Sequence, residues 1–166
     1  MLRRMGDGIV IRAAAIADVP AIAAIRATGL ESQAFWEGRV RGYLEGTHSP
    51  RQALPERAVW VALGEDRVIG LVAGHRTCRF ECDGELQWID VAREFRGRGI
   101  ADRRVGTMLS WFRQRNLYRV CVNVASENAI ARNLYAKHGA VPKSAGWMEW
   151  RDLRQSTFST HTANQG

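Results

Sequence analysis

The stretch DVAREFRGRGIADRR, residues 90–104, holds five arginines and two glycines. Arginines repel one another unless an anion lies among them, and glycines cost ordering entropy unless something must approach the backbone closely. Arg96 and Arg98 supply positive charge, while Gly97 and Gly99 allow a tight turn with bare amide groups. This composition is typical of a phosphate-binding loop, although a structural turn carrying solvated arginines would show it too.

The elements on either side would aim this loop at an anion. The apolar run at 85–91 predicts a strand that ends at the loop, and apolar residues at helical spacing predict an amphipathic helix from 100 to about 115. The start of that helix would direct free amide groups and a positive dipole end at the loop, which suits a pyrophosphate. The loop lacks the third glycine of the dinucleotide fingerprint and the lysine ending of a P-loop.

The rest of the chain predicts an α/β (α+β) fold, with a mixed, mostly antiparallel central sheet flanked by helices. Strands are expected at 8–12, 57–63, 67–80, 85–91, 118–124 and 144–152. Helices are expected from Asp18 as N-cap to Gly29, and at 32–45, 100–115 and 128–138, while residues 46–57 indicate a loop. We expect one domain over residues 1–153 and a polar, frayed tail over 154–166.

Composition narrows the class of protein without choosing a ligand. The net charge of +7 favours polyanions, whether nucleic acid, an anionic membrane surface or a nucleotide cofactor. Arginine supplies most of that charge, and genomic composition alone can explain the bias. Three cysteines and four histidines show no metal-ligand or disulfide spacing, so we expect reduced core thiols and no metal site. No export or transmembrane segment is recognised, and a cytoplasmic location with no membrane partner is expected.

Two separated motifs resemble those of the GNAT superfamily of N-acetyltransferases. The run VAREFRGRGIA is similar to its acyl-CoA signature, Arg/Gln-x-x-Gly-x-Gly/Ala, with Arg96, Gly99 and the less common Ala101 in the defined places. The run NAIARNLYAKHG at 128–139 resembles the second motif of the superfamily. The resemblance covers about residues 8–152 in the expected element order, and it implies a GNAT-like fold with acetyl-CoA (coenzyme A) as the acetyl donor.

The resemblance also implies which residues hold that donor. The pyrophosphate would lie on the loop formed by Arg96, Gly97, Arg98, Gly99, Ile100 and Ala101. The pantetheine arm would pair with the strand end formed by Ile89, Asp90 and Val91. Asn128 and Tyr135 lie two helical turns apart and share a face along which the arm could run.

Acetyl transfer to an amine requires a proton for the departing thiolate and a base for the nucleophile. Tyr135 suits the acid role, because an ordinary phenol with a pKa of about 10 holds its proton at neutral pH. Glu85 suits the base role, because strand alternation would place it on one face with Gln87, Ile89 and Val91. A core aromatic ring, a solvated hairpin carboxylate and catalysis by water alone are the alternatives left open.

The sequence therefore predicts an acetyl-CoA-dependent N-acetyltransferase in which a primary amine attacks the bound thioester directly. The sequence does not identify the acceptor, which is a small molecule or a protein. The resemblance implies that residues 28–56 and 76–84 form the part of the site that binds it. The alternatives are a basic nucleic-acid or ribosome-associated binding module and a non-catalytic acyl-CoA sensor. Recognised nucleic-acid motifs are absent from the sequence, which disfavours the first. The oligomeric state, including a homodimer, stays open.

Overall fold

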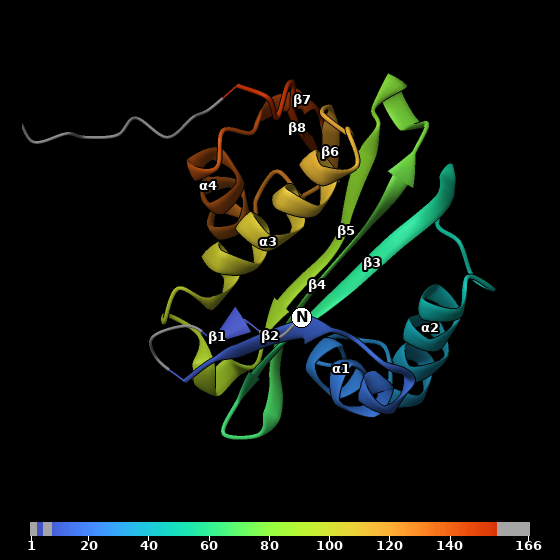
Figure 1. Ribbon diagram of the computed structural model, residues 1–166, viewed down its shortest axis with the longest axis vertical. Coiled ribbons are helices and arrows are strands. Elements are labelled where there is room, and N and C mark those ends of the chain that lie inside the picture. Colours follow the sequence, from blue (N-terminus) through green and yellow to red (C-terminus); the bar gives the residue numbers. More distant parts are fainter. Residues whose placement is uncertain (1–2, 5–7, 156–166) are drawn as a thin grey trace, which may run out of the picture.

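The computed structural model describes residues 3–4 and 8–155, and these form one sheet with helices on both faces (Figure 1). The strands are β1 Arg3–Arg4, β2 Val10–Ala13, β3 Ala53–Gly64, β4 Arg67–Thr77, β5 Gly84–Val91, β6 Val120–Asn123, β7 Val141–Ser144 and β8 Trp147–Trp150. The helices are α1 Val19–Arg26, α2 Gln33–Glu45, α3 Ile100–Gln114 and α4 Ala129–Lys137. Most of the predicted tail, from residue 156 onwards, lies outside the described residues.

The eight described strands follow the order β1-β2-β3-β4-β5-β6-β8-β7. Every neighbouring pair in that series is antiparallel except β5 and β6, which run parallel. This confirms the mixed, mostly antiparallel sheet predicted from the sequence. None of the helices in the described part of the chain is long and apolar enough to span a bilayer.

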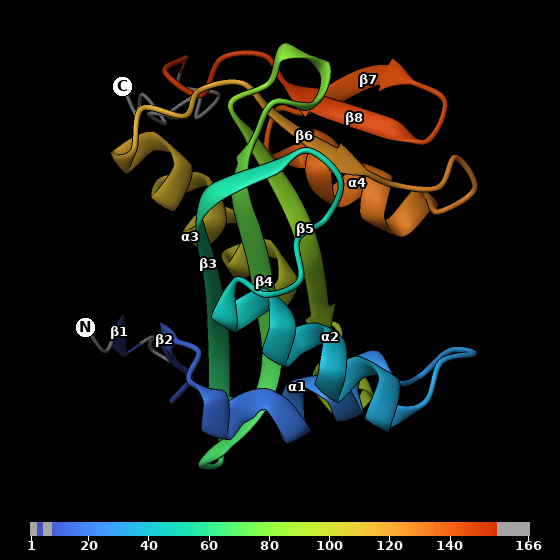
Figure 2. The same cartoon turned by 90° about the vertical axis from the view of Figure 1, so that its right-hand side faces the viewer.

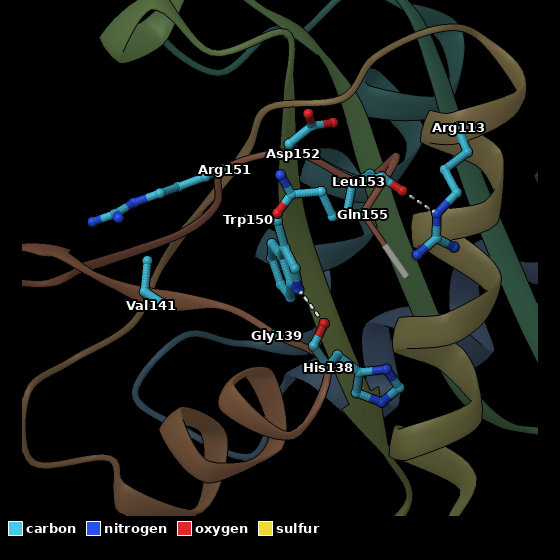
Figure 3. Close-up of a pocket in the computed structure, with 9 residues that line it drawn as sticks. All are labelled: Arg113, His138, Gly139, Val141, Trp150, Arg151, Asp152, Leu153 and Gln155. Carbon is cyan, nitrogen blue, oxygen red and sulfur yellow. Dashed lines mark hydrogen bonds between the residues drawn. The ribbon is translucent and has the colours of Figure 1, made fainter. Parts of the chain in front are cut away.

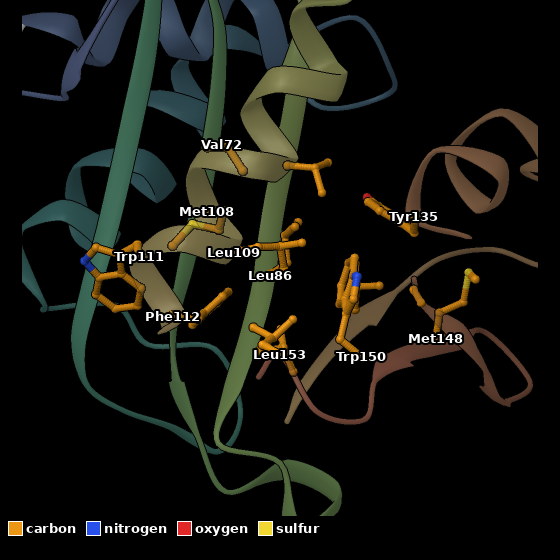
Figure 4. Close-up of a cluster of buried hydrophobic side chains, with 14 of the residues drawn as sticks. Val72, Leu86, Met108, Leu109, Trp111, Phe112, Tyr135, Met148, Trp150 and Leu153 are labelled. Carbon is orange, nitrogen blue, oxygen red and sulfur yellow. The ribbon is translucent and has the colours of Figure 1, made fainter. Parts of the chain in front are cut away.

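Two apolar layers fix the helices to the sheet. Met108 and Phe112 of α3 and Trp150 of β8 belong to a buried cluster that joins α3 and α4 to one face (Figure 4). Tyr43 of α2 and Trp88 of β5 belong to a second cluster, which joins α1 and α2 to the opposite face. Because both faces of β4 and β5 are covered, their side chains are largely buried, and a site on β5 is held from two sides.

Local chemistry sets the ends of these elements. The two-residue turn between β3 and β4 places Glu65 and Asp66 at φ of 53° and 61°, the left-handed pair of a tight hairpin. Ser32 caps α2 by accepting a bond from the Phe35 amide at 3.1 Å, and Gly46 ends it at φ of 76°. These signals explain why the predicted positions of the hairpin and of α2 are confirmed.

The strand β5 contains a β-bulge at Gln87. Trp88 pairs with Ala73 of β4, but Leu86 pairs with Gly74, so one residue of β5 is left over between them. A bulge reverses the alternation of side chains beyond it. Glu85, Gln87, Ile89 and Val91 therefore do not share one face, and the alternation predicted from the sequence is wrong for this strand.

Beyond the bulge, β5 separates from β6. Their parallel pairing covers three positions, in which Gly84, Glu85 and Leu86 lie opposite Val120, Cys121 and Val122. Asp83 fixes the start of this pairing, because its carboxylate accepts from the amides of Tyr118 and Arg119 at 3.0 and 2.9 Å. In Figure 2, β6, β8 and β7 turn away across the upper part of the view while β5 continues past α4. The final residues of β5 therefore have one free side.

Several predicted boundaries are wrong. The loop expected at 46–57 ends early, because β3 begins at Ala53 and is irregular up to Arg57. The strand expected at 67–80 stops at Thr77, and the strand expected at 144–152 is limited to Trp147–Trp150. Asp18 is the N-cap residue of α1 as predicted, but its carboxylate pairs with Arg12 and makes no cap bond. The strand β7 was not predicted, because Pro142 indicated a break in structure, yet proline is tolerated on a sheet edge.

Replacing Gly84 with alanine should destabilise the fold. An added Cβ would lie 2.6 Å from Cε1 of Phe112, a fully buried ring that has no room to move aside. We expect a loss of about 1–3 kcal/mol in the free energy of unfolding, measured by urea denaturation. Gly106→Ala in α3 is the matched control, because its new methyl meets nothing within 4 Å and alanine favours helix. Equal stabilities of the two variants would contradict this packing.

Candidate active site

A cavity of about 650 Å³ opens where β5 separates from β6. Its walls are the end of β5, the loop that follows, the first turn of α3 and one side of α4. The residues that line it are Ile89, Asp90, Val91, Phe95, Arg96, Gly97, Gly99, Ile100, Ala101, Asp102, Asn128, Ile130, Ala131, Leu134 and Lys137. We call this cavity the cleft. It is large enough for the arm of an extended ligand.

One end of the cleft is built to hold an anion. Gly97 and Gly99 adopt φ of 79° and 75°, a left-handed conformation that favours glycine. Gly99 is also the N-cap of α3, whose first amides have no partner within the helix and carry its positive dipole end. The loop, the helix start and the exposed Arg96 together supply donors and charge suited to a phosphate group.

The other end of the cleft offers the bare edge of a strand. The Ala92 amide donates to the Ile69 carbonyl of β4 at 2.8 Å, and this bond determines which alternate residues of β5 hydrogen-bond to β4. With this pattern the backbone N–H and C=O groups of Ile89 and Val91 point away from β4, towards the side where β5 no longer pairs with β6. Arg96 Nε already donates to the Val91 carbonyl at 3.1 Å, so it ties the loop to the strand end.

The helix α4 is anchored as the opposite wall. Asn128 caps its start by accepting from the Ala131 amide at 3.1 Å. At its end, Asp102 of α3 contacts Lys137 Nζ and His138 Nε2, each at 3.0 Å. Burial alone would raise the pKa of Asp102, but its bonds with Lys137 and His138 outweigh burial and lower that pKa. This contact ties the two helices that face each other across the cleft.

A second cavity, of about 170 Å³, lies behind the end of α4 and adds to that anchoring (Figure 3). There the Trp150 indole donates to the His138 carbonyl at 3.0 Å, and Arg113 Nε donates to the Leu153 carbonyl at 2.8 Å. None of the residues predicted for the site lines this cavity. Its contacts hold α4 to β8 and hold the chain after β8 to α3.

The structure gathers nine of the predicted residues along the cleft. They are Ile89, Asp90, Val91, Arg96, Gly97, Gly99, Ile100, Ala101 and Asn128. Arg98 is not among the lining residues, and its guanidinium stacks over the Phe95 ring at 4.9 Å. The lining residues that sequence reasoning missed include Leu134 and Lys137, which helical spacing from Asn128 and Ala131 could have indicated.

Tyr135 lies behind the cleft wall and is nearly buried. Its ring meets Trp150 edge to face at 5.7 Å, within the cluster drawn in Figure 4. Burial, and to a smaller extent the charge of Asp90, raises the pKa of Tyr135 to about 12. The phenol therefore holds its proton throughout the neutral range.

Glu85 lies on the α1 and α2 side of the sheet and is buried. Its Oε2 accepts from Arg79 Nε at 3.2 Å and from Thr77 Oγ1 at 3.4 Å, and it lies 3.4 Å from His75 Nε2. His75 Nδ1 in turn lies 2.9 Å from the hydroxyl of Tyr43. This is a closed polar chain inside the protein, and Glu85 is not among the lining residues of the cleft.

A third cavity, of about 310 Å³, lies on the α2 side of β5. Trp36 and Trp88 form part of its wall, and the bulge residue Gln87 reaches its lining. Arg26 of α1 stacks over both indoles, at 4.2 Å and 4.9 Å, and pairs with the carboxylate of Asp90. Because Asp90 lines the cleft, this ion pair connects the walls of the two cavities. Sequence reasoning missed Arg26, which carries no motif.

This arrangement defines a class of protein. A mixed sheet with one parallel pair, from which β5 runs into a loop rich in glycine and arginine at the start of a helix, agrees with the GNAT-like fold that the sequence resemblance implied. The profile of the Acetyltransferase (GNAT) family matches residues 28–140. The chain therefore belongs to the GNAT family of acetyltransferases.

Individual relatives agree with that assignment. Over 80 residues the chain is 32% identical to the "Probable N-acetyltransferase camello" of Xenopus tropicalis, an alignment that covers 48% of this chain and 36% of that protein. The PaiA N-acetyltransferase of Thermoplasma acidophilum, solved in complex with coenzyme A, has a TM-score of 0.63 and 15% identity, covering 86% of this chain and 98% of that one. A ribosomal-protein-alanine N-acetyltransferase of Brucella melitensis has a TM-score of 0.64 and 21% identity, covering 85% and 98%. The solved structures share the fold.

Replacing Gly99 with alanine should weaken binding of acetyl-CoA at least tenfold, measured by calorimetry, because the loop amides would leave their left-handed arrangement. Gly46→Ala is a matched control, since Gly46 caps α2 at φ of 76° and ψ of 12° and Gly99 caps α3 at 75° and 12°. Both variants should lose about 1–2 kcal/mol of folding stability from the same strain. An equal affinity for acetyl-CoA in the two variants would show that the loop does not contribute to binding of acetyl-CoA.

Proposed function

We propose that the protein transfers an acetyl group from acetyl-CoA to a primary amine, by direct attack of the amine on the bound thioester. The observation that carries this proposal is the cleft, which combines an anion-binding loop with the free edge of a strand. Acetyl-CoA carries a pyrophosphate followed by an arm that contains amide groups. Its pyrophosphate needs the loop, and its amide groups need the strand edge next to that loop.

The residues of the cleft divide the work of holding the donor. The amides from Arg96 to Ala101 receive the pyrophosphate, with charge from the start of α3. The backbone of Ile89 and Val91 pairs with the amides of the pantetheine arm, as a missing strand would. Asn128, Ala131 and neighbouring residues of α4 cover the arm from the other side. Acetyl-CoA supplies the activated acetyl group, and the chain orients it.

Tyr135 is proposed as the acid that protonates the departing thiolate. Its raised pKa, about 12, keeps the phenol protonated, and it follows Leu134 of α4, which lines the cleft. Glu85 was the base nominated from the sequence. In the structure its carboxylate is buried, contacts His75 and Arg79, and is not among the residues that line the cleft.

The acceptor enters the proposal as a primary amine of a small molecule or of a protein, reached from the α2 side of β5. The third cavity, with its aromatic wall, supports this approach. A cytoplasmic location is part of the proposal, and the three free cysteines fit a reducing compartment.

Thermal unfolding in the presence of acetyl-CoA tests the donor first, with ATP, NAD and a short DNA duplex as controls. Ligand at about 100 times its dissociation constant adds about 2.7 kcal/mol to the free energy of unfolding. A rise in Tm with acetyl-CoA alone is expected. Release of free thiol then identifies acceptors among spermidine, 2-phenylethylamine, alanine and an alanine-terminated peptide. A rise with DNA and none with acetyl-CoA would overturn the proposal in favour of a nucleic-acid-binding module.

The variant Tyr135→Phe should lower kcat by about 10²–10⁴ for the best acceptor of that panel, because the leaving thiolate loses its proton donor. Its affinity for acetyl-CoA should stay within twofold of the parent, measured by calorimetry. Tyr118→Phe is the matched control, since that hydroxyl donates to Asn116 at the surface. An unchanged kcat in Tyr135→Phe would exclude this residue from the chemistry.

A further inference from the structure

Two carboxylates of β5 face the α1 and α2 side of the sheet, and they differ in what they can reach. Glu85 lies before the bulge, and Asp90 lies beyond it, near the loop. The acetyl-transfer step needs one group that can contact the incoming amine. The surroundings of each carboxylate decide between them.

Glu85 is enclosed. Its side chain is 5% exposed, and it already contacts the guanidinium of Arg79, the hydroxyl of Thr77 and the ring of His75. Those neighbours satisfy the carboxylate within the protein. An amine could reach it only if these contacts were broken, which carries the cost of leaving a buried charge without its partner.

Asp90 is accessible. Its side chain is 31% exposed, and it lines the cleft in the segment of β5 that carries the free backbone edge. The guanidinium of its partner Arg26 lies 4.2 and 4.9 Å from the ring centres of Trp36 and Trp88, and both rings also line the third cavity. The carboxylate thus stands where the cavity proposed for the acceptor meets the cleft proposed for the donor.

We propose that Asp90, held in place by Arg26, binds the ammonium group of the acceptor and takes its first proton. This inference rests on the proposed function, and it replaces Glu85 as the base. Arg26 is a positioning residue, because it acts through Asp90. The ion pair orients the carboxylate, and 31% of the Asp90 side chain stays exposed.

The proton transfers balance as follows. Asp90 forms an O–H bond as one N–H bond of the ammonium breaks, and the electron pair left on nitrogen attacks the thioester carbon. When the C–S bond breaks, its electron pair leaves on sulfur, and Tyr135 gives that thiolate its phenolic proton. The nitrogen loses its second proton to the Tyr135 phenolate, and Asp90 releases its proton to solvent through the cleft.

Burial and two charged neighbours set the pH at which Asp90 becomes ionised. Burial raises the pKa of Asp90, while Arg26 from α1 and Arg96 from the loop lower it. Tyr135 of α4 stays neutral in this range, because burial raises its pKa. A base must be ionised, so activity should fall on the acid side as pH drops through the pKa of Asp90. Loss of Arg26 should move that acid limb to higher pH.

The first test compares Asp90→Asn with the parent on the best acceptor of the amine panel. We expect kcat/KM for the acceptor to fall at least a hundredfold and the acid limb of its pH profile to disappear. Calorimetric affinity for acetyl-CoA should stay within threefold. Asp66→Asn is the matched control, because Asp66 lies in the exposed β3–β4 turn at φ of 61°, where asparagine is well tolerated. Its activity should equal that of the parent.

Arg26 variants keep the test decisive even if Asp90→Asn does not fold. Arg26→Gln should shift the acid limb to higher pH and raise the KM for the acceptor, and Arg26→Lys should restore part of the shift. A merely structural role for the pair would lower activity equally at every pH. An unmoved acid limb in Arg26→Gln would therefore overturn the inference.

Glu85→Gln separates the two candidate bases. If it abolishes the acid limb while Asp90→Asn retains it, Glu85 is the base and the inference fails while the proposed function stands. If the parent binds acetyl-CoA but acetylates no amine of the panel, the proposed function fails and takes the inference with it. These outcomes are distinct, because the first leaves a working enzyme and the second leaves a binding protein.

Discussion

The separation of β5 from β6 is the structural constraint on which the site depends. Within a continuous sheet, the backbone N–H and C=O groups of Ile89 and Val91 would hydrogen-bond to a neighbouring strand. The bulge at Gln87 and the short parallel pairing prevent this, and they leave polar backbone groups beside an open cleft. Unsatisfied backbone groups are costly, so the fold tolerates them only where solvent or a ligand completes the bonding. The cleft is where the ligand would do so.

The parting strand also divides the site into two electrostatic halves. At the loop end, left-handed glycines, the start of α3 and an exposed arginine favour anions. On the opposite side of β5, aromatic rings and a carboxylate paired with Arg26 favour cations and apolar groups. One strand that is buried from both faces can present a different chemistry to each side. This polarity suits a reaction that joins an anionic donor to an amine.

Short sequence motifs predicted the position of the loop and of α4 correctly. The glycine and arginine spacing located the loop, the Asn128 cap located α4, and both motifs fell on the walls of the cleft. The faces of β5 could not be predicted, because a bulge depends on which partner residues it skips, and periodicity assumes that none is skipped. Arg26 could not be predicted either. It comes from α1, 64 positions from Asp90, and only tertiary packing brings the two together.

The β-strand β7 and the early start of β3 were missed for a different reason. Proline and glycine mark breaks in local structure, but Pro142 lies on a sheet edge, where no ladder hydrogen bond is lost. Sequence rules describe what a residue prevents in a typical setting. The edge of a sheet is an atypical setting, and it is recognised only once the strand order is known.

The short junction between β5 and β6 also has a consequence for the lifetime of the protein. Three backbone pairs and the Asp83 carboxylate link the sheet to the segment that carries β6, β8, β7 and α4. The buried cluster around Met108, Phe112 and Trp150 and the contacts of Asp102 with Lys137 and His138 also hold this segment, through α3. A ligand that bridges β5 and α4 closes the same junction, and mass action then stabilises the closed form. A bound ligand would thereby make this part of the chain harder for a protease to open.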